Sequence, residues 1–125
     1  MSSYDENIAW AAGFFEGDAG IFIDKRGRVT LEAEQVDPRV LYRMAGTLGG
    51  YVTLRGTRDV WRWRLSAEKG VLHALNCLRP HMDGPKLLQL TVARDRINGR
   101  TPVDQARRAL WHLKGQHVQA HVQGS

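Results

Sequence analysis

The sequence predicts an α+β fold in the order αββαββα, followed by a C-terminal helical tail. Two stretches alternate apolar and polar residues and are broken by short turns at residues 25–28 and 56–59, which is the pattern of a β-hairpin. Helix-length segments precede and follow each stretch. Two such hairpins are expected to form one curved, four-stranded antiparallel sheet, with helices on a single face and the other face open.

The first half of the chain accounts for one helix and one hairpin. Asp5 is suited to cap a helix that runs from about residue 7 to residue 17. Residues 20–24 then change to a period of two, and residues 29–34 continue it with apolar side chains at the odd positions. The first hairpin should therefore have one core face and one polar face.

The second hairpin follows a helix of its own. Asp37 and Pro38 are a cap and a first helical residue, and the Gly49-Gly50 pair closes that helix. Five apolar residues of the hairpin are expected to face the core: Val52, Leu54, Trp61, Trp63 and Leu65.

Three further helices complete the chain. Ser66 is expected to cap one that Pro80 ends, and Pro85 opens another that ends near Gly99. The residues from Thr101 to Asp104 resemble a capping box and open the last helix. We divide the chain into a domain of residues 1–99 and a helical extension of the same domain, residues 100–125.

Composition restricts the partners. The 125 residues suffice for one domain. The excess of 18 basic over 13 acidic residues favours a polyanionic partner. Fourteen of the 18 basic residues are arginine, whose forked guanidinium group can donate two hydrogen bonds to a phosphate or a guanine edge.

Cys77 is the only cysteine, which excludes a disulfide framework and a zinc cluster. His112, His117 and His121 do not have the spacing of a metal site. Without a signal peptide or membrane-length apolar run, we expect a soluble, intracellular protein with no membrane partner.

The open face of the sheet is the candidate DNA-binding surface. Arginine can read guanine in the major groove, threonine can contact a base edge or a thymine methyl group, and a carboxylate can accept from cytosine. A polar strand face is commonly only solvated, but here four strands offer the same surface together. The ten residues assigned to it are Asp24, Arg26, Arg28, Thr30, Glu32, Glu34, Thr53, Arg55, Arg62 and Arg64.

The most informative segment is WAAGFFEGDAGIFI, residues 10–23. Its small residues Ala12, Gly13 and Gly17 are expected along one helix face, which ends on Glu16 and Asp18. Each glycine sacrifices about 1 kcal/mol of helix propensity. The compensating gain is a close approach between two helix backbones.

Residues 11–19, AAGFFEGDA, resemble the LAGLIDADG motif of homing endonucleases. Gly13, Gly17 and Asp18 match the motif, while Ala19 replaces a usual glycine. The resemblance runs from about Ile8 to Ile97, through QVDPRVL, TLGGYV, WRWRLS, LRPHM and PKLLQ in family order.

The resemblance implies a single-motif homing endonuclease, the kind of enzyme linked to intron or intein mobility. Such a protein is a homodimer that binds a long, near-palindromic duplex and cuts both strands to leave 3′ overhangs. The dimer would form through Ala12, Gly13, Glu16 and Gly17.

The resemblance also implies the residues of the reaction. The Asp18 carboxylate and the Gly17 carbonyl would bind Mg²⁺ or another divalent cation such as Mn²⁺, which prefer oxygen ligands. Gln35 would orient the attacking water, and Lys86 would stabilise charge developing on the phosphate.

Two other functions fit the same sequence. The fold can serve without cleavage, as a DNA-binding regulator or an RNA-splicing maturase. Alternatively, the glycine-bearing helix mediates self-association in an interaction protein, and the basic face only favours solubility.

Overall fold

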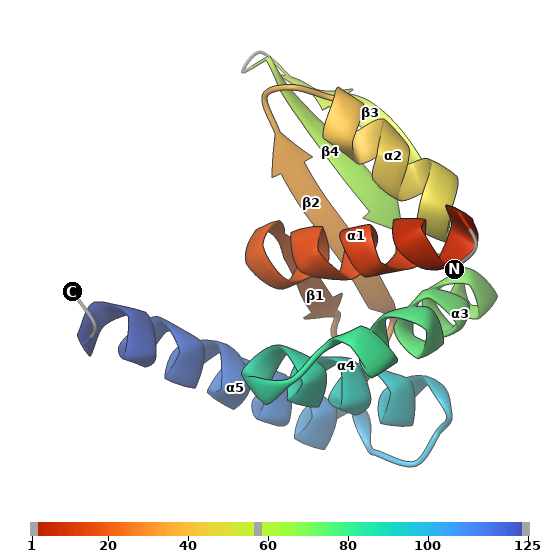
Figure 1. Ribbon diagram of the computed structural model, residues 1–125. Helices are drawn as coiled ribbons and strands as arrows, with labels where there is room; N and C mark the ends of the chain where they lie inside the picture. The colour runs from red at the N-terminus through yellow and green to blue at the C-terminus, as the bar shows by residue number, and fades with distance from the viewer. Residues whose placement is uncertain (1–2, 57–58, 124–125) are drawn as a thin grey trace.

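The computed structural model describes residues 3–56 and 59–123, and side chains as far as residue 115. Its elements are, in chain order, α1 (Ser3–Asp18), β1 (Ala19–Ile23), β2 (Val29–Gln35), α2 (Arg39–Leu48), β3 (Tyr51–Arg55), β4 (Val60–Leu65), α3 (Glu68–Leu78), the 3₁₀ helix η2 (Arg79–His81), α4 (Gly84–Ile97) and α5 (Val103–Gln123). The predicted α+β order and the C-terminal helical tail are confirmed (Figure 1).

The four strands form one open antiparallel sheet in the order β1-β2-β4-β3. The register pairs Ala19 with Ala33 and Leu31 with Leu65, so the apolar positions of neighbouring strands share one face. Helices α1 and α2 lie across that face in Figure 1, while α5 runs past β1 and projects on the side where α1 ends. The opposite face of the sheet is the open face, as the sequence predicts.

The core lies between the sheet and the helices. Phe15 of α1, Ile21 of β1 and Trp63 of β4 are fully buried there. The Trp63 indole N–H donates to the Gly49 carbonyl oxygen at 2.8 Å, which fixes the end of α2 to β4. The next residue, Gly50, has a φ of +94°, and an added Cβ would lie 2.5 Å from a backbone oxygen of β4, so only glycine fits this turn.

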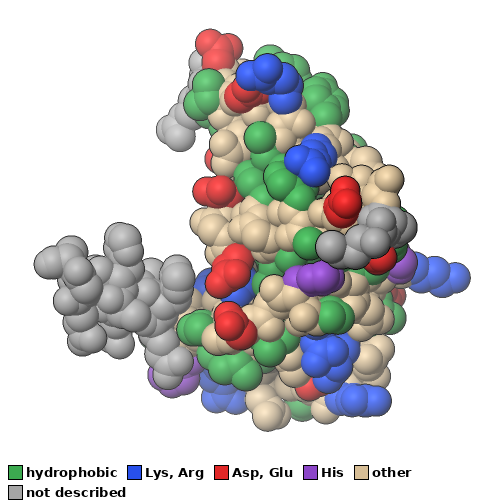
Figure 2. All heavy atoms as spheres, viewed as in Figure 1, with side chains coloured by type: hydrophobic (Ala, Val, Ile, Leu, Met, Phe, Trp, Pro, Cys, Tyr) green, Lys and Arg blue, Asp and Glu red, His purple; other side chains and the backbone are tan. Residues whose placement is uncertain are grey.

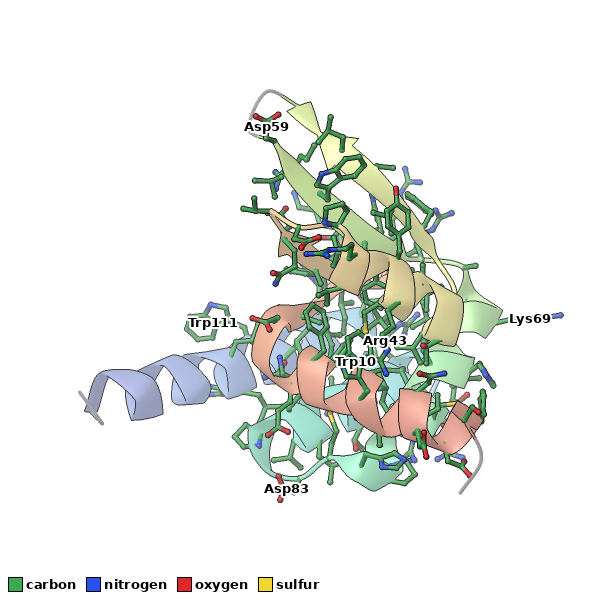
Figure 3. All side chains as sticks on the ribbon, turned by 45° about the horizontal axis from the view of Figure 1, so that its top comes forward. Trp10, Arg43, Asp59, Lys69, Asp83 and Trp111 are labelled. Atoms are coloured by element: carbon green, nitrogen blue, oxygen red, sulfur yellow. The ribbon has the colours of Figure 1, made fainter. Side chains whose placement is uncertain are left out.

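Helices α1 and α2 also contact each other outside the core. The Arg43 guanidinium of α2 lies 4.0 Å from the centre of the Trp10 ring of α1. The two labelled side chains lie next to each other in Figure 3. Arg43 also donates to the Asn7 side-chain oxygen at 3.2 Å. These contacts hold α1 at a fixed angle over the sheet, with its C-terminal end directed at the start of β1.

Several local predictions are wrong. Helix α1 already begins at Ser3, so Asp5 lies inside its first turn, where an acidic side chain favours the helix dipole. Ser66 is not the cap of α3, because Ala67 occupies that position. Asp37 also lies one residue before the N-cap of α2, which is Pro38.

The core assignment of Leu54 is also wrong, because the side chain is 50% exposed. Its strand, β3, is the last in the sheet, and most of its residues are exposed. The alternation of the hairpin gives the correct face for Leu54 but not the extent of the helix layer above it.

Candidate functional site

The C-terminal end of α1 carries the motif acids. Glu16, Gly17 and Asp18 are all exposed, and β1 begins at the very next residue, Ala19. Ala19 is buried, so it anchors the helix-to-strand junction in the core while the acids before it face outward. Within the described part of the chain, no hydrogen bond or ion pair engages the Asp18 carboxylate, which leaves its oxygens available as ligands.

Lys86 lies at this junction. It comes from the first turn of α4, and its Nζ donates to the Ala19 carbonyl oxygen at 2.9 Å. Burial lowers the pKa of Lys86, and the nearby Glu16 charge partly opposes that shift. The structure therefore brings a half-buried ammonium group next to the residue that follows Asp18.

Gln35 lies at the same end of the sheet. It is the last residue of β2, and the register pairs Ala33 with Ala19, so Gln35 extends two residues beyond the start of β1. Its side chain is partly buried. Three residues from separate elements thus come to one end of the sheet: Asp18, Gln35 and Lys86.

The donor set at this end fits half of a divalent-metal site. The Asp18 carboxylate and the Gly17 carbonyl supply the hard oxygen atoms that Mg²⁺ or Mn²⁺ prefers. Among the described residues, no group of three or more His, Cys, Asp or Glu side chains could hold a metal ion.

The outward face of α1 is made of small residues. Gly13 and Gly17 are exposed, and a Cβ built on either glycine would meet nothing within 4 Å. Ala9 precedes them on the same face at helical spacing, and we call Ala9, Gly13 and Gly17 the glycine face. Tan atoms, which are backbone and uncharged side chains of other types, make up most of the visible surface over α1, and Lys and Arg side chains are scattered rather than gathered there (Figure 2).

The expectation that Ala12 shares this face is wrong. Ala12 is 1% exposed and packs in the core with Ala11 and Phe15. One helical step of 100° separates Ala12 from Gly13, and that rotation is enough to move a side chain from the outward face to the core. Glu16 does lie outward, next to Gly17.

On the open face, the acidic residues are paired with arginines. Glu34 of β2 accepts hydrogen bonds from Arg55 and, at 3.2 Å, from Arg62. Glu32 lies opposite Arg64, with 3.4 Å between a carboxylate oxygen and the arginine Nε. Burial raises the pKa of Glu34, but the hydrogen bonds from Arg62 and Arg55 outweigh it and leave that pKa below its usual value. The carboxylates therefore position arginines, and their use as acceptors for cytosine stays a prediction.

Two of the ten residues assigned to the open face differ from the others in their contacts or exposure. Asp24 forms the β1–β2 turn, because its Oδ1 accepts from the backbone N–H groups of Arg26 at 2.8 Å and Arg28 at 2.9 Å. These backbone hydrogen bonds, led by that from Arg28, lower the pKa of Asp24. Thr30 is only 9% exposed, so it offers little surface to a ligand.

Sequence reasoning missed functional candidates at both ends of the open face. Phe22 of β1 and Tyr51 of β3 pair with Thr30 and Arg64, so both aromatic side chains belong to this face, and both are about half exposed. The period of two already places them there. The competing signal is composition, because aromatic residues in strands ordinarily pack in the core.

It also missed two basic residues of α5. The Lys114 Nζ donates to the Ile21 carbonyl oxygen at 2.5 Å, and the Arg107 Nε donates to that of Ile23 at 3.2 Å. Burial lowers the pKa of Lys114, as does the charge of Lys86. Residues seven apart lie on one face of a helix, so the spacing of Arg107 and Lys114 was the available signal.

Other candidates stay outside this site. Cys77 of α3 is partly buried, with its sulfur 3.5 Å from the Tyr4 hydroxyl and 3.6 Å from His73 Nε2. His112 is exposed on α5, whereas His117 and His121 lie outside the described side chains. In the described part of the chain, no helix has the length and apolar character needed to cross a membrane.

Comparison with known proteins places the fold. No family model matches the chain, and no curated protein matches it. The archaeal intron-encoded homing endonuclease I-Vdi141I, solved in complex with DNA, aligns with a TM-score of 0.66 and 16% identity over 89% of this chain and 84% of its own. The homing endonuclease I-CvuI, solved with its target in the presence of calcium, aligns with a TM-score of 0.57 and 17% identity over 89% of this chain and 96% of its own.

A larger protein of the same kind matches over part of its length. The LAGLIDADG meganuclease I-CpaMI, bound to uncleaved DNA, aligns with a TM-score of 0.60 and 16% identity over 73% of this chain but 35% of its own. The motif residues 11–19 lie at the junction of α1 and β1, in a chain of which 89% aligns with I-Vdi141I. The chain therefore has the fold of the LAGLIDADG homing endonucleases, with a single copy of the motif.

Proposed function

We propose that the chain is a site-specific, double-strand DNA endonuclease that acts as a homodimer. It binds a long, near-palindromic duplex and hydrolyses one phosphodiester bond in each strand to leave 3′ overhangs. The observation that carries the proposal is the exposed Asp18 carboxylate at the end of α1, beside a lysine ammonium group. The Lys86 Nζ donates a hydrogen bond of 2.9 Å to the carbonyl oxygen of Ala19, the residue that follows Asp18. I-Vdi141I and I-CvuI, which share the fold, were both solved with DNA, and this supports DNA as the partner.

The proposal of a homodimer is supported by the number of acidic ligands that the reaction needs. One chain supplies only half of the acidic ligands that two scissile phosphates need. The glycine face of α1 is exposed and ends at Asp18, so packing two copies of it would bring two Asp18 carboxylates together near a two-fold axis. The match to only 35% of I-CpaMI supports the same arrangement, because that single chain is long enough to hold more than one such unit.

The reaction assigns one task to each residue at this end of the sheet. Asp18 and the Gly17 carbonyl would hold a divalent ion, which supplies Lewis-acid stabilisation of the attacking and leaving oxygens. Gln35 orients the attacking water. Lys86 stabilises negative charge on the phosphate, since its ammonium group is held in place by Ala19 and half-buried, where electrostatic stabilisation is stronger than in water.

The open face supplies sequence recognition. A twisted antiparallel sheet fits the major groove, where Arg62 and Arg64 can donate to guanine edges. Arg55 and Arg62 share Glu34, so the guanidinium groups are oriented before DNA arrives. Pre-organised arginines lose less side-chain entropy on binding and discriminate better between bases.

Incubation of the purified protein with a randomised duplex library and Mg²⁺ tests this function. Sequencing of new DNA ends should find one preferred site cut in both strands, and Asp18→Asn should abolish cutting but keep site enrichment in binding. Asp59→Asn is the matched control, because Asp59 lies at the tip of the β3–β4 hairpin (Figure 3) and its φ of +53° suits asparagine. Enrichment of a site without cutting by the wild type would identify a DNA-binding regulator, and no enrichment would exclude a DNA reader.

A further inference from the structure

A groove of about 630 Å³ separates α5 from β1. Phe22 and Ile23 form its β1 side. The α5 side includes four exposed or partly exposed residues: Arg107, Arg108, Trp111 and Lys114. Asp104 is the one acidic residue in its lining. The groove therefore carries a net positive charge next to two exposed aromatic rings.

This groove continues the open face of the sheet. Phe22 lies between the buried residues Ile21 and Ile23 in sequence and pairs with Thr30, so its ring belongs to the open face. The Lys114 Nζ lies 4.2 Å from the centre of that ring. DNA lying on the open face would therefore reach α5 without any rearrangement of the chain.

Lys114 forms a row with Lys86, which lies at the end of the sheet that carries Asp18. Lys86 donates to the carbonyl oxygen of Ala19 and Lys114 to that of Ile21. These two oxygens are two residues apart and lie on the same edge of β1. Two residues of a strand advance by about 6.6 Å, so the two ammonium groups are held at a spacing of this order. Successive phosphates along one DNA strand are separated by a similar distance.

We propose that the groove between α5 and β1 binds the DNA backbone beside the cleavage site, with Lys114 on the phosphate next to the one that Lys86 faces. The inference rests on the proposed function for its position on DNA, but not for its preference for a polyanion. Each lysine uses one N–H group on its carbonyl oxygen and has two left for a phosphate. Trp111 is 73% exposed and packs against the adjoining deoxyribose.

A duplex backbone is favoured over an acidic peptide as the occupant. The groove opens onto a sheet face that already presents several arginines. A duplex backbone is long enough to contact the groove and that face together, whereas a short acidic peptide would fill the groove alone. In Figure 3, Trp111 stands out from α5 clear of the body, as a side chain does when its contact surface is provided by a partner. The C-terminal helix is then part of the DNA-binding surface instead of a tail.

The first test measures the salt dependence of binding to a mixed-sequence duplex without Mg²⁺. Each phosphate contact contributes about −0.9 to the slope of log K against log salt, so Lys114→Ala should make the slope of a dimer shallower by roughly 1.8. Lys114→Arg should restore it. Lys69→Ala is the control, because Lys69 is exposed on α3 and projects away from the sheet (Figure 3). An unchanged slope in Lys114→Ala would overturn the proposal.

Trp111→Ala provides a variant that should fold normally, since the ring is largely exposed. It should raise the Kd for the duplex by roughly five- to tenfold, the scale expected for one aromatic ring buried against a ligand. Thermal melting of each variant shows whether the loss of a contact has altered the fold. A Kd equal to that of wild type would count against the groove.

A selected target with single neutral methylphosphonate linkages locates the contact. Replacing the phosphate next to the scissile one should weaken binding of the wild type but not of Lys114→Ala. If the protein selects no site, the proposed function fails while the mixed-duplex slope still tests the groove. If a site is cut and the neutral linkage weakens both proteins equally, the groove assignment fails while the nuclease stands.

Discussion

Glu32 on β2 and Arg64 on β4 lie directly opposite each other on the open face, with 3.4 Å between carboxylate oxygen and guanidinium Nε. The next pair along the strands, Glu34 and Arg62, repeats the arrangement at 3.2 Å. Acids placed this way do not merely reduce the positive charge of the surface. They hold the arginine heads in register with the sheet, so that position as well as charge can select a base.

Glu34→Gln should therefore separate affinity from selectivity. Loss of the charge frees Arg55 and Arg62, so binding to mixed-sequence duplex should tighten and its salt dependence should steepen. Discrimination in favour of the selected site should fall by about 1 kcal/mol, because mobile arginines fit several bases. Competition binding measures both quantities. Glu68→Gln, at an exposed position on α3, is expected to leave discrimination unchanged, and equal effects of both substitutions would contradict the role of Glu34.

Gly13→Leu should disrupt the dimer without harming the monomer. Nothing lies within 4 Å of a Cβ at Gly13, and leucine raises helix propensity by about 1 kcal/mol, so the free energy of unfolding of the monomer should rise slightly. A bulky side chain would nevertheless keep two glycine faces apart. Sedimentation at matched concentrations should show dimer for wild type and monomer for the variant.

Gly46→Leu is the control for that experiment. Gly46 lies on α2 and is exposed, and a Cβ added there would also meet nothing within 4 Å. The Gly46→Leu variant should gain the same helix propensity as Gly13→Leu but remain dimeric. A dimer that persists in Gly13→Leu would show that α1 does not form the interface.

The pH dependence of cleavage should report the protonation of the Lys86 side chain. Its pKa is lowered by burial, so the ammonium group loses its proton at a lower pH than an ordinary lysine, whose pKa is 10.5. The single-turnover rate should therefore fall as the pH rises toward that value. Lys86→Arg keeps its charge throughout this range and should remove the decline, whatever its effect on the maximal rate. A decline of identical position in both proteins would assign it to another group.

The stability of α2 at acid pH should depend on Asp37. Hydrogen bonds from the Arg39 side chain lower the pKa of Asp37 from 3.8 to about 2. Because the folded-state pKa is the lower one, the pair stabilises the protein above the unfolded-state pKa, and that stability is lost as the pH falls from 3.8 through about 2. The difference in urea midpoint between wild type and Asp37→Asn should shrink across this window.

Arg39→Gln provides a check on that assignment. It removes the side-chain partner of Asp37, including the contact of 2.6 Å between guanidinium and carboxylate. The difference in urea midpoint between wild type and Arg39→Gln should shrink across the same window, but by less than for Asp37→Asn, because the backbone N–H of residue 39 still donates to the Asp37 carboxylate. A constant difference between wild type and either variant would mean that the ion pair does not form in solution.

The sequence predicts the element order and the open face because both depend on the spacing of apolar residues a few positions apart. Alternation at Val29, Leu31 and Ala33 specifies one buried face wherever the strand is placed in the sheet. It does not specify how far the helices extend, and Leu54 is exposed for that reason. Likewise, Ala12 and Gly13 are both small, so the sequence shows that two backbones can approach there but not which of them faces out.

The candidate site was only partly predictable. Asp18 and Lys86 follow from motif positions, and the structure brings them to one junction. The pairing of Glu34 with Arg62 depends on the β2–β4 register, which joins strands separated by a whole helix and hairpin. Lys114 depends on how α5 docks against β1, and no local pattern contains that information.

The free edge of β1 has three outward carbonyl oxygens, at Ala19, Ile21 and Ile23, and each accepts from a basic side chain. An uncovered edge strand offers a template on which a second chain can extend the sheet. Here the acceptors are already occupied by groups that carry positive charge, so another strand that approached would meet both steric and electrostatic resistance. The helices that supply these side chains thereby protect the protein against edge-to-edge aggregation, and the N-terminal strand keeps one partner, β2.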